Sequence, residues 1–140
     1  DYNVPAPLEQ IAALYSRVCP GWDAVTFARV RAALSLDLKK RYAALSRGQK
    51  VQFQLLLALA RKPRLFLLDE VTALLDVEVR DVLLGELKKA VQVGGATVLA
   101  ATNIVVELTG YADELLVLRD GVLGEDADLE TLLRQGRQAG

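Results

Sequence analysis

Histidine and methionine are both absent from the 140-residue sequence, and Cys19 is its only cysteine. The lack of histidine excludes histidine general bases and histidine metal ligands, while a single cysteine excludes an internal disulfide bond and fits a reducing compartment. Because the first residue is Asp1 rather than methionine, we expect a fragment, a processed chain or a trimmed chain. None of the ten glycines is followed by lysine, so the phosphate-binding loop G-x-x-x-x-G-K-[ST] is missing too.

Long apolar runs and an excess of one charge are also missing. The longest apolar run, residues 55–60, is far shorter than the roughly 18 residues that span a bilayer. No basic segment precedes an apolar one at the start, so no secretion signal is visible. Seventeen basic and eighteen acidic residues give a net charge of −1, which argues against a nucleic-acid partner. The apolar fraction of 52% is enough to build a core, and the length predicts one domain or a large piece of one.

Apolar side chains at helical spacing predict helices in the first half of the chain. One covers residues 7–18, a second follows Asp23 as its N-cap, and a third begins at Ser46. Ser46 and Gln49 have the spacing of a capping box, in which each side chain bonds the backbone of the other residue. The side chains expected to face inward from the second helix are Val25, Phe27, Val30, Ala33 and Leu34.

Short apolar runs in the second half predict strands. Residues 65–68 and 97–101 are expected to be strands buried on both faces, and residues 115–118 a third buried strand. A helix containing Val79 to Val91 separates the first two. The remaining signals are Gly94-Gly95 as a helix stop, Asp120-Gly121 as a turn into a short return strand, and Asp128 as the cap of a final helix. The order of elements predicts an α/β fold, with a helical subdomain over residues 1–45 and an α/β part over residues 46–140.

The segment Leu45-Ser46-Arg47-Gly48-Gln49 opens the third helix. A helix N-terminus presents unpaired N–H groups and a partial positive charge, so it favours an anion on its axis. Ser46 adds a hydroxyl, and Gly48 lets the backbone approach a ligand closely. The same residues are equally compatible with an ordinary capping box on a core helix.

Two carboxylates, Asp69 and Glu70, follow the predicted strand 65–68. Open α/β sheets bind ligands at the carboxyl ends of their parallel strands. There Asp69 would hold Mg²⁺ through water, and Glu70 would orient and deprotonate a water that attacks a γ-phosphate. The alternative is a pair of acidic residues that merely begins a turn.

Taken in order, these motifs resemble the ATP-binding cassette (ABC) ATPases, over residues of about 13 to 133. Residues 45–49 match the signature L-S-G-G-Q of that family, with Arg47 in place of its first glycine. Residues 65–70 are similar to the Walker B strand of the family, and residues 73–76, with Asp76, are similar to its D-loop. Residues 97–102 are similar to the strand that enters the H-loop, and residues 112–121 to the segment that follows the H-loop. The resemblance implies a partial P-loop NTPase, namely the Walker B half of a doubly wound sheet with an N-terminal helical subdomain.

In this family two such domains dimerise head to tail, and each ATP lies between the Walker A loop of one domain and the signature helix of the other. The resemblance therefore implies that Ser46, Arg47, Gly48 and Gln49 contact the nucleotide of the partner domain. It implies that Glu70 and Asn103 are catalytic toward this domain's own ATP, with Asp69 on Mg²⁺.

The departures from the family pattern are specific. The Walker A loop, the aromatic residue that stacks on adenine and the Q-loop glutamine would lie upstream of Asp1. Asn103 stands at the position of the switch histidine, where it offers amide donors but no ring charge. Val71 replaces the usual proline, and Glu70 is retained, so hydrolysis is not excluded.

The leading interpretation is the nucleotide-binding domain of an ABC exporter, which couples ATP binding and hydrolysis to transport. It would lie in the cytoplasm on the inner face of the cell membrane, with the helical subdomain against a transmembrane permease subunit. We expect ATP hydrolysis only when the Walker A portion completes the site, and an inactive chain otherwise. One alternative is a degenerate cassette that acts as a non-hydrolysing interaction or regulatory module. Another, which the balanced charge disfavours, is a soluble ABC ATPase acting on DNA or ribosomes.

Overall fold

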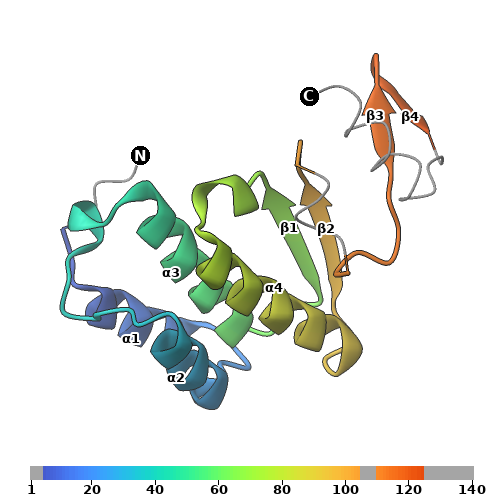
Figure 1. Cartoon of the computed structure of the whole chain (residues 1–140). Coiled ribbons are helices and arrows are strands. Elements are labelled where there is room, and N and C mark those ends of the chain that lie inside the picture. Colours follow the sequence, from blue (N-terminus) through green and yellow to red (C-terminus); the bar gives the residue numbers. More distant parts are fainter. Residues whose placement is uncertain (1–4, 105–109, 125–140) are drawn as a thin grey trace. The chain divides into compact units, whose positions relative to one another are not determined.

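The computed structural model describes residues 5–104 and 110–124. The chain divides into two compact units, Asp1–Thr102 and Asn103–Gly140 (Figure 1). The predicted helical subdomain and the helix that begins at Ser46 both lie in the first unit, where α2 (Ala24–Ala33) packs on α3 (Arg47–Ala60). No helix among the described residues combines the length and the apolar character that crossing a membrane requires.

Capping side chains set the starts of three of the four described α-helices in the first unit, while the helix of Leu8–Val18 follows Pro7 without a side-chain cap. The Asp23 carboxylate accepts hydrogen bonds from the backbone N–H groups of Val25 and Thr26, both at 3.0 Å, as predicted for an N-cap. Ser46 and Gln49 form the predicted capping box. The helices are α1 (Leu8–Val18), α2 (Ala24–Ala33), α3 (Arg47–Ala60) and α4 (Val77–Gln92), with 3₁₀ turns η1 (Tyr42–Ala44) and η2 (Thr72–Leu74).

The core lies where α3 packs between α2 and α4 (Figure 1). Phe53 and Leu56 of α3 are fully buried there, together with Val30 of α2 and Leu83 of α4. The inward face predicted for α2 is only partly right. Val30 and Leu34 are buried and Phe27 is half-buried, but Val25 and Ala33 are exposed. Val25 precedes Val30 by five residues, which places it about 140° away around the helix, on the opposite side from α3.

Two parallel strands, β1 (Leu65–Asp69) and β2 (Thr97–Ala101), form the sheet of the first unit. They pair in register from Leu65 with Thr97 to Asp69 with Ala101, and α4 forms the crossover between them. The prediction that both faces are buried is wrong for the described structure. Phe66 and Leu68 are buried, whereas Leu67 and its partner Leu99 are 69% and 56% exposed. Helices α3 and α4 lie on one side of the sheet, so within the described part of the first unit they cover one face alone (Figure 1).

The described part of the second unit contains a hairpin of β3 (Val117–Arg119) and β4 (Val122–Gly124). Asp120 and Gly121 both have positive φ, 51° and 78°, as a two-residue type I′ turn requires, so the predicted turn and return strand are confirmed. The predicted buried strand 115–118 is wrong in extent and burial. The strand begins at Val117 and pairs locally with β4, and Leu118 is 71% exposed. The predicted cap at Asp128 lies outside the described residues.

Candidate functional site

The first turn of α3 carries the predicted anion-binding residues. The Ser46 hydroxyl accepts a hydrogen bond from the Gln49 N–H at 3.2 Å, and the Gln49 side-chain oxygen accepts one from the Ser46 N–H at 3.3 Å. Ser46 and Arg47 are exposed, while Gly48 and Gln49 are half-buried. The capping reading is thus confirmed. The capping box does not exclude anion binding at this helix end, because a capped first turn still presents its positive end to solvent.

Asp69 is the last residue of β1, and Glu70 is the first residue after it. Both are exposed at the carboxyl end of the strand. Glu70 has a left-handed backbone conformation, with φ of 48°, and its N–H donates to the Ala101 carbonyl at 2.9 Å. Such a conformation is unfavourable for a residue with a side chain and is concentrated at functional positions. The hydrogen bond to β2 therefore fixes a sharp change of direction just where the predicted catalytic carboxylate begins.

The chain then runs through η2 to Asp76. The Asp76 carboxylate accepts a hydrogen bond from the Val79 N–H at 3.0 Å and so caps α4, a structural role that the motif alone did not indicate. The η2 turn also touches α3. A Cβ atom added to Gly48 would lie 2.7 Å from the Leu74 carbonyl oxygen. The structure thus brings the first turn of α3 directly against the turn that joins Glu70 to Asp76.

Asn103 is the first residue of the second unit and is exposed. The units are separate bodies, so its place at a γ-phosphate stays a prediction. Among the described residues, no three Asp, Glu, Cys or His side chains gather where they could hold a metal ion. Mg²⁺ usually takes one or two carboxylates together with phosphate oxygens and water. The donors at the end of β1, Asp69 and Glu70, therefore fit a metal that arrives with a nucleotide rather than one held by a protein cage.

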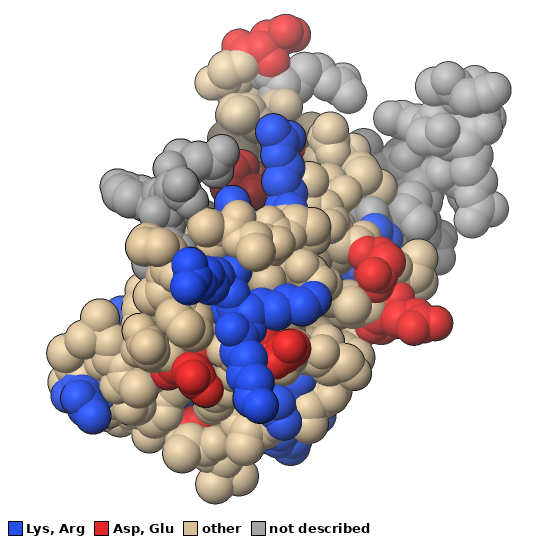
Figure 2. Space-filling model, turned by 90° about the vertical axis from the view of Figure 1, so that its left-hand side faces the viewer, with Lys and Arg blue, Asp and Glu red and all other residues tan. Residues whose placement is uncertain are grey.

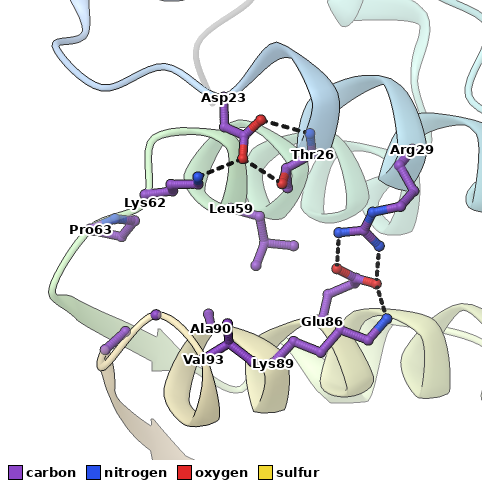
Figure 3. A pocket seen from close by; sticks show the side chains of 12 residues that line it. Asp23, Thr26, Arg29, Leu59, Lys62, Pro63, Glu86, Lys89, Ala90 and Val93 are labelled. Atoms are coloured by element: carbon purple, nitrogen blue, oxygen red, sulfur yellow. Dashed lines mark hydrogen bonds and ion pairs between the residues drawn. The ribbon is translucent and has the colours of Figure 1, made fainter.

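A pocket of about 440 Å³, which the sequence did not predict, lies between α2, the end of α3 and α4 (Figure 3). Glu86 of α4 accepts hydrogen bonds from the two terminal nitrogens of Arg29 across it, one at 2.7 Å, and from Lys89 at 2.9 Å. At the other end, Lys62 pairs with Asp23 at 2.7 Å. The one sequence signal was an acidic residue, Glu86, on the apolar face of α4.

The ion pairs shift the acidity of the groups that line this pocket. The hydrogen bond from Arg29 lowers the pKa of Glu86, and the hydrogen bond from Lys89 lowers it further. Burial alone would raise this pKa, but the two hydrogen bonds outweigh it. The hydrogen bond from Lys62 holds the pKa of Asp23 well below its usual range, helped by Thr26. On the face of the molecule seen from the left of Figure 1, basic and acidic side chains lie next to one another (Figure 2). The charged side chains that line the pocket are therefore already paired with one another.

A helix N-terminus, a carboxylate pair at the end of a parallel strand and a short turn in contact with both are arranged as in the α/β nucleotide-binding domains. Similarity to known proteins shows which of the α/β nucleotide-binding proteins this chain resembles. The chain is 40% identical over 88 residues to the aliphatic sulfonates import ATP-binding protein SsuB of Yersinia pestis bv. Antiqua (strain Antiqua), covering 63% of this chain and 32% of that protein.

It is also 37% identical over 92 residues to the Fe(3+) ions import ATP-binding protein FbpC of Pseudomonas fluorescens (strain Pf0-1), covering 65% of this chain and 26% of that protein. The chain therefore spans about a third or less of the length of these curated relatives. A solved structure described as an ATP binding subunit of an ABC transporter matches with a TM-score of 0.75 and 23% identity, over 100% of this chain and 60% of the other. No protein-family model matches the chain.

The homologues of this chain are thus ATP-binding proteins of ABC transporters, and its fold is that of part of an ABC ATPase domain. The resemblance and the α/β fold class inferred from the motifs are confirmed. The roles of the individual site residues remain predictions.

Proposed function

We propose that this chain is part of the nucleotide-binding domain of an ABC transporter, which binds ATP with Mg²⁺ and hydrolyses it in a complete subunit. The observation that carries the proposal is the assembly of both predicted site segments in one unit. Gly48, in the first turn of α3, lies against the turn that follows Glu70. Family resemblance and geometry therefore point to the same residues.

In this proposal each site residue has a separate task. Glu70 is the general base that orients and deprotonates the attacking water, and Asp69 holds Mg²⁺ through water. Asn103 donates a neutral hydrogen bond to the γ-phosphate. Residues 46–49 contact the nucleotide bound by a second such domain, and Asp76 lies in the D-loop at the same interface. The lysine loop that cradles the β- and γ-phosphates is not among these 140 residues and would come from another part of the subunit.

We also propose a direction of transport. The motifs alone favoured an exporter, but both relatives named above are called import proteins, which favours uptake. In either direction α1 and α2, within the proposed subdomain of residues 1–45, would contact the transmembrane permease on the cytoplasmic side of the membrane.

The second candidate is a degenerate cassette that binds partners without hydrolysing ATP. Asn103 at the switch position favours it, because an amide cannot supply the charge of an imidazolium. The retained Glu70 counts against it.

Substitutions at the two carboxylates in the complete subunit distinguish these candidates. We expect Glu70→Gln to lower turnover by about 100-fold or more while ATP binding persists, because the amide keeps the shape but cannot accept a proton. Asp69→Asn should instead weaken the Mg²⁺-dependent binding of ATP. ATPase assays and calorimetric titrations with and without Mg²⁺ measure both. A wild-type subunit with no turnover would favour the degenerate cassette, and equal loss of binding in both variants would contradict the division of roles.

A further inference from the structure

Gly48 occupies a position in α3 that has no room for a side chain. A Cβ atom there would lie 2.7 Å from the Leu74 carbonyl oxygen, and real Cβ atoms essentially never come within 3.0 Å of such a neighbour. Gly85, in the middle of α4, differs in this respect, because a Cβ there would meet nothing within 4 Å. Gly48 is therefore required by the close approach of two backbone segments, apart from any need to approach a phosphate.

The segment that Gly48 touches is anchored at both of its ends. At one end the Glu70 N–H is bonded to Ala101 of β2. At the other end Asp76 caps α4, and the Arg80 side chain donates to the Leu75 carbonyl at 3.0 Å. Between them the Leu75 N–H donates to the Thr72 carbonyl at 3.1 Å and closes the turn. A displacement at Leu74 would therefore pass to its ends rather than being absorbed by a flexible loop.

We propose that Gly48 is a positioning residue whose contact with the Leu74 carbonyl holds the first turn of α3 and the turn of residues 70–76 in one fixed relation. The surface that serves the nucleotide of the partner domain and the loop that serves the domain's own nucleotide then move as one body. The identity of the two nucleotide sites rests on the proposed function above, whereas the contact itself does not.

Hydrogen exchange of the 140-residue chain at low concentration tests the contact directly. Gly48→Ala should accelerate amide exchange in peptides covering residues 70–80 and leave exchange in peptides covering residues 86–92 unchanged. Gly85→Ala is the matched control: it replaces a helical glycine with space around it, and should slow exchange within α4 and leave residues 70–76 unchanged. Acceleration spread evenly over the whole first unit, or confined to residues 46–50, would overturn the proposal.

Mixed dimers of complete subunits test the coupling. In a pair of Gly48→Ala with Glu70→Gln, the only functional base belongs to the Gly48→Ala subunit, and the signature segment opposite it is intact. If Gly48 served the partner's nucleotide alone, turnover would equal that of a wild-type subunit paired with Glu70→Gln. We expect about tenfold lower turnover, because small misplacements of catalytic groups are costly. A Gly85→Ala subunit in the same pairing should match the reference.

Equal turnover in the Gly48→Ala and reference pairs would overturn the coupling. Failure of the proposed function gives a different result. Altered exchange at residues 70–80, combined with a wild-type subunit that does not hydrolyse ATP, would support the contact and count against the assignment as an ATPase.

Discussion

Two sets of carboxylates in the first unit lie in opposite surroundings. Asp23 and Glu86 line the pocket beside α4, and basic side chains hold both at hydrogen-bond distance. Asp69 and Glu70 are exposed at the carboxyl end of β1, where neither forms an ion pair with another residue of the described part. The same side-chain chemistry is thus neutralised in one place and left available in the other.

The contrast distinguishes carboxylates that are used within the fold from carboxylates that are available to a ligand. A carboxylate that already accepts hydrogen bonds from arginine or lysine has little left for a ligand, and its main effect is to join helices. An exposed carboxylate at a strand end keeps its lone pairs for a metal or a water. We therefore propose the functional site at the strand end rather than in the pocket.

Breaking the pocket pair should have the largest effect on stability. We expect Glu86→Gln to lower the free energy of unfolding by about 1–2 kcal/mol, because Arg29 loses a charged partner but is half exposed and can be hydrated. Urea unfolding at pH 7 measures this. Asp81→Asn, at an exposed carboxylate on the same helix, should change it by less than about 0.5 kcal/mol. Equal effects at both positions would contradict the structural role of Glu86.

The same variant predicts a pH dependence. The folded-state pKa of Glu86 lies below its ordinary value of 4.5, so its contribution is fully present above that pH. It is lost as the pH falls through the lower folded-state pKa. The difference in stability between wild type and Glu86→Gln should therefore be constant above about pH 5 and shrink at lower pH. A difference that grows on acidification would have the wrong sign.

The sheet face that no described element of the first unit covers predicts self-association of the 140-residue chain. Leu67 and Leu99 pair across β1 and β2 and are both largely exposed, and adjoining exposed apolar side chains favour association. The double variant Leu67→Thr, Leu99→Thr should raise the monomer fraction in a light-scattering concentration series. Val25→Thr, at an exposed large apolar side chain on α2, is the matched control and should leave association unchanged. A wild-type chain that stays monomeric at high concentration would contradict the prediction.

The smallest expected effect concerns Asn103. If it donates to a γ-phosphate in the complete subunit, Asn103→His should raise turnover a few-fold, most clearly below about pH 7, where imidazole becomes charged. ATP affinity should change less than the rate. If Asn103 is instead only a helix N-cap, histidine should lower the melting temperature and leave turnover unchanged or lower. ATPase assays from pH 6 to 8, together with melting curves, decide between these outcomes.

Local chemistry made much of this fold predictable. Asp23, Ser46 and the Asp120-Gly121 turn each set their own element through nearby hydrogen bonds or backbone preference, and all three were predicted correctly. Burial was not predictable in the same way, because it depends on what packs against an element. An apolar run such as residues 65–68 is the same whether one or both of its faces are covered.

The same distinction between local chemistry and long-range packing applies to the candidate site. The sequence predicted Ser46, Gly48, Asp69 and Glu70 as site residues through their order along the chain, and their roles remain predictions. The sequence suggested only that Gly48 lets the backbone approach a ligand. The contact with the Leu74 carbonyl could not be predicted, because it joins segments that are distant in sequence. The pair of Arg29 and Glu86, 57 residues apart, was missed for the same reason.

The central claim is that the exposed carboxylates act in catalysis and the paired ones in folding. It is tested most directly by measuring turnover and melting temperature for Glu70→Gln and Glu86→Gln in the complete subunit, side by side. We predict opposite patterns. Glu70→Gln should lose turnover with an unchanged melting temperature, and Glu86→Gln should lose several degrees in melting temperature with turnover retained below it. Loss of turnover in Glu86→Gln at a temperature where it is fully folded, with Glu70→Gln still active, would contradict the account.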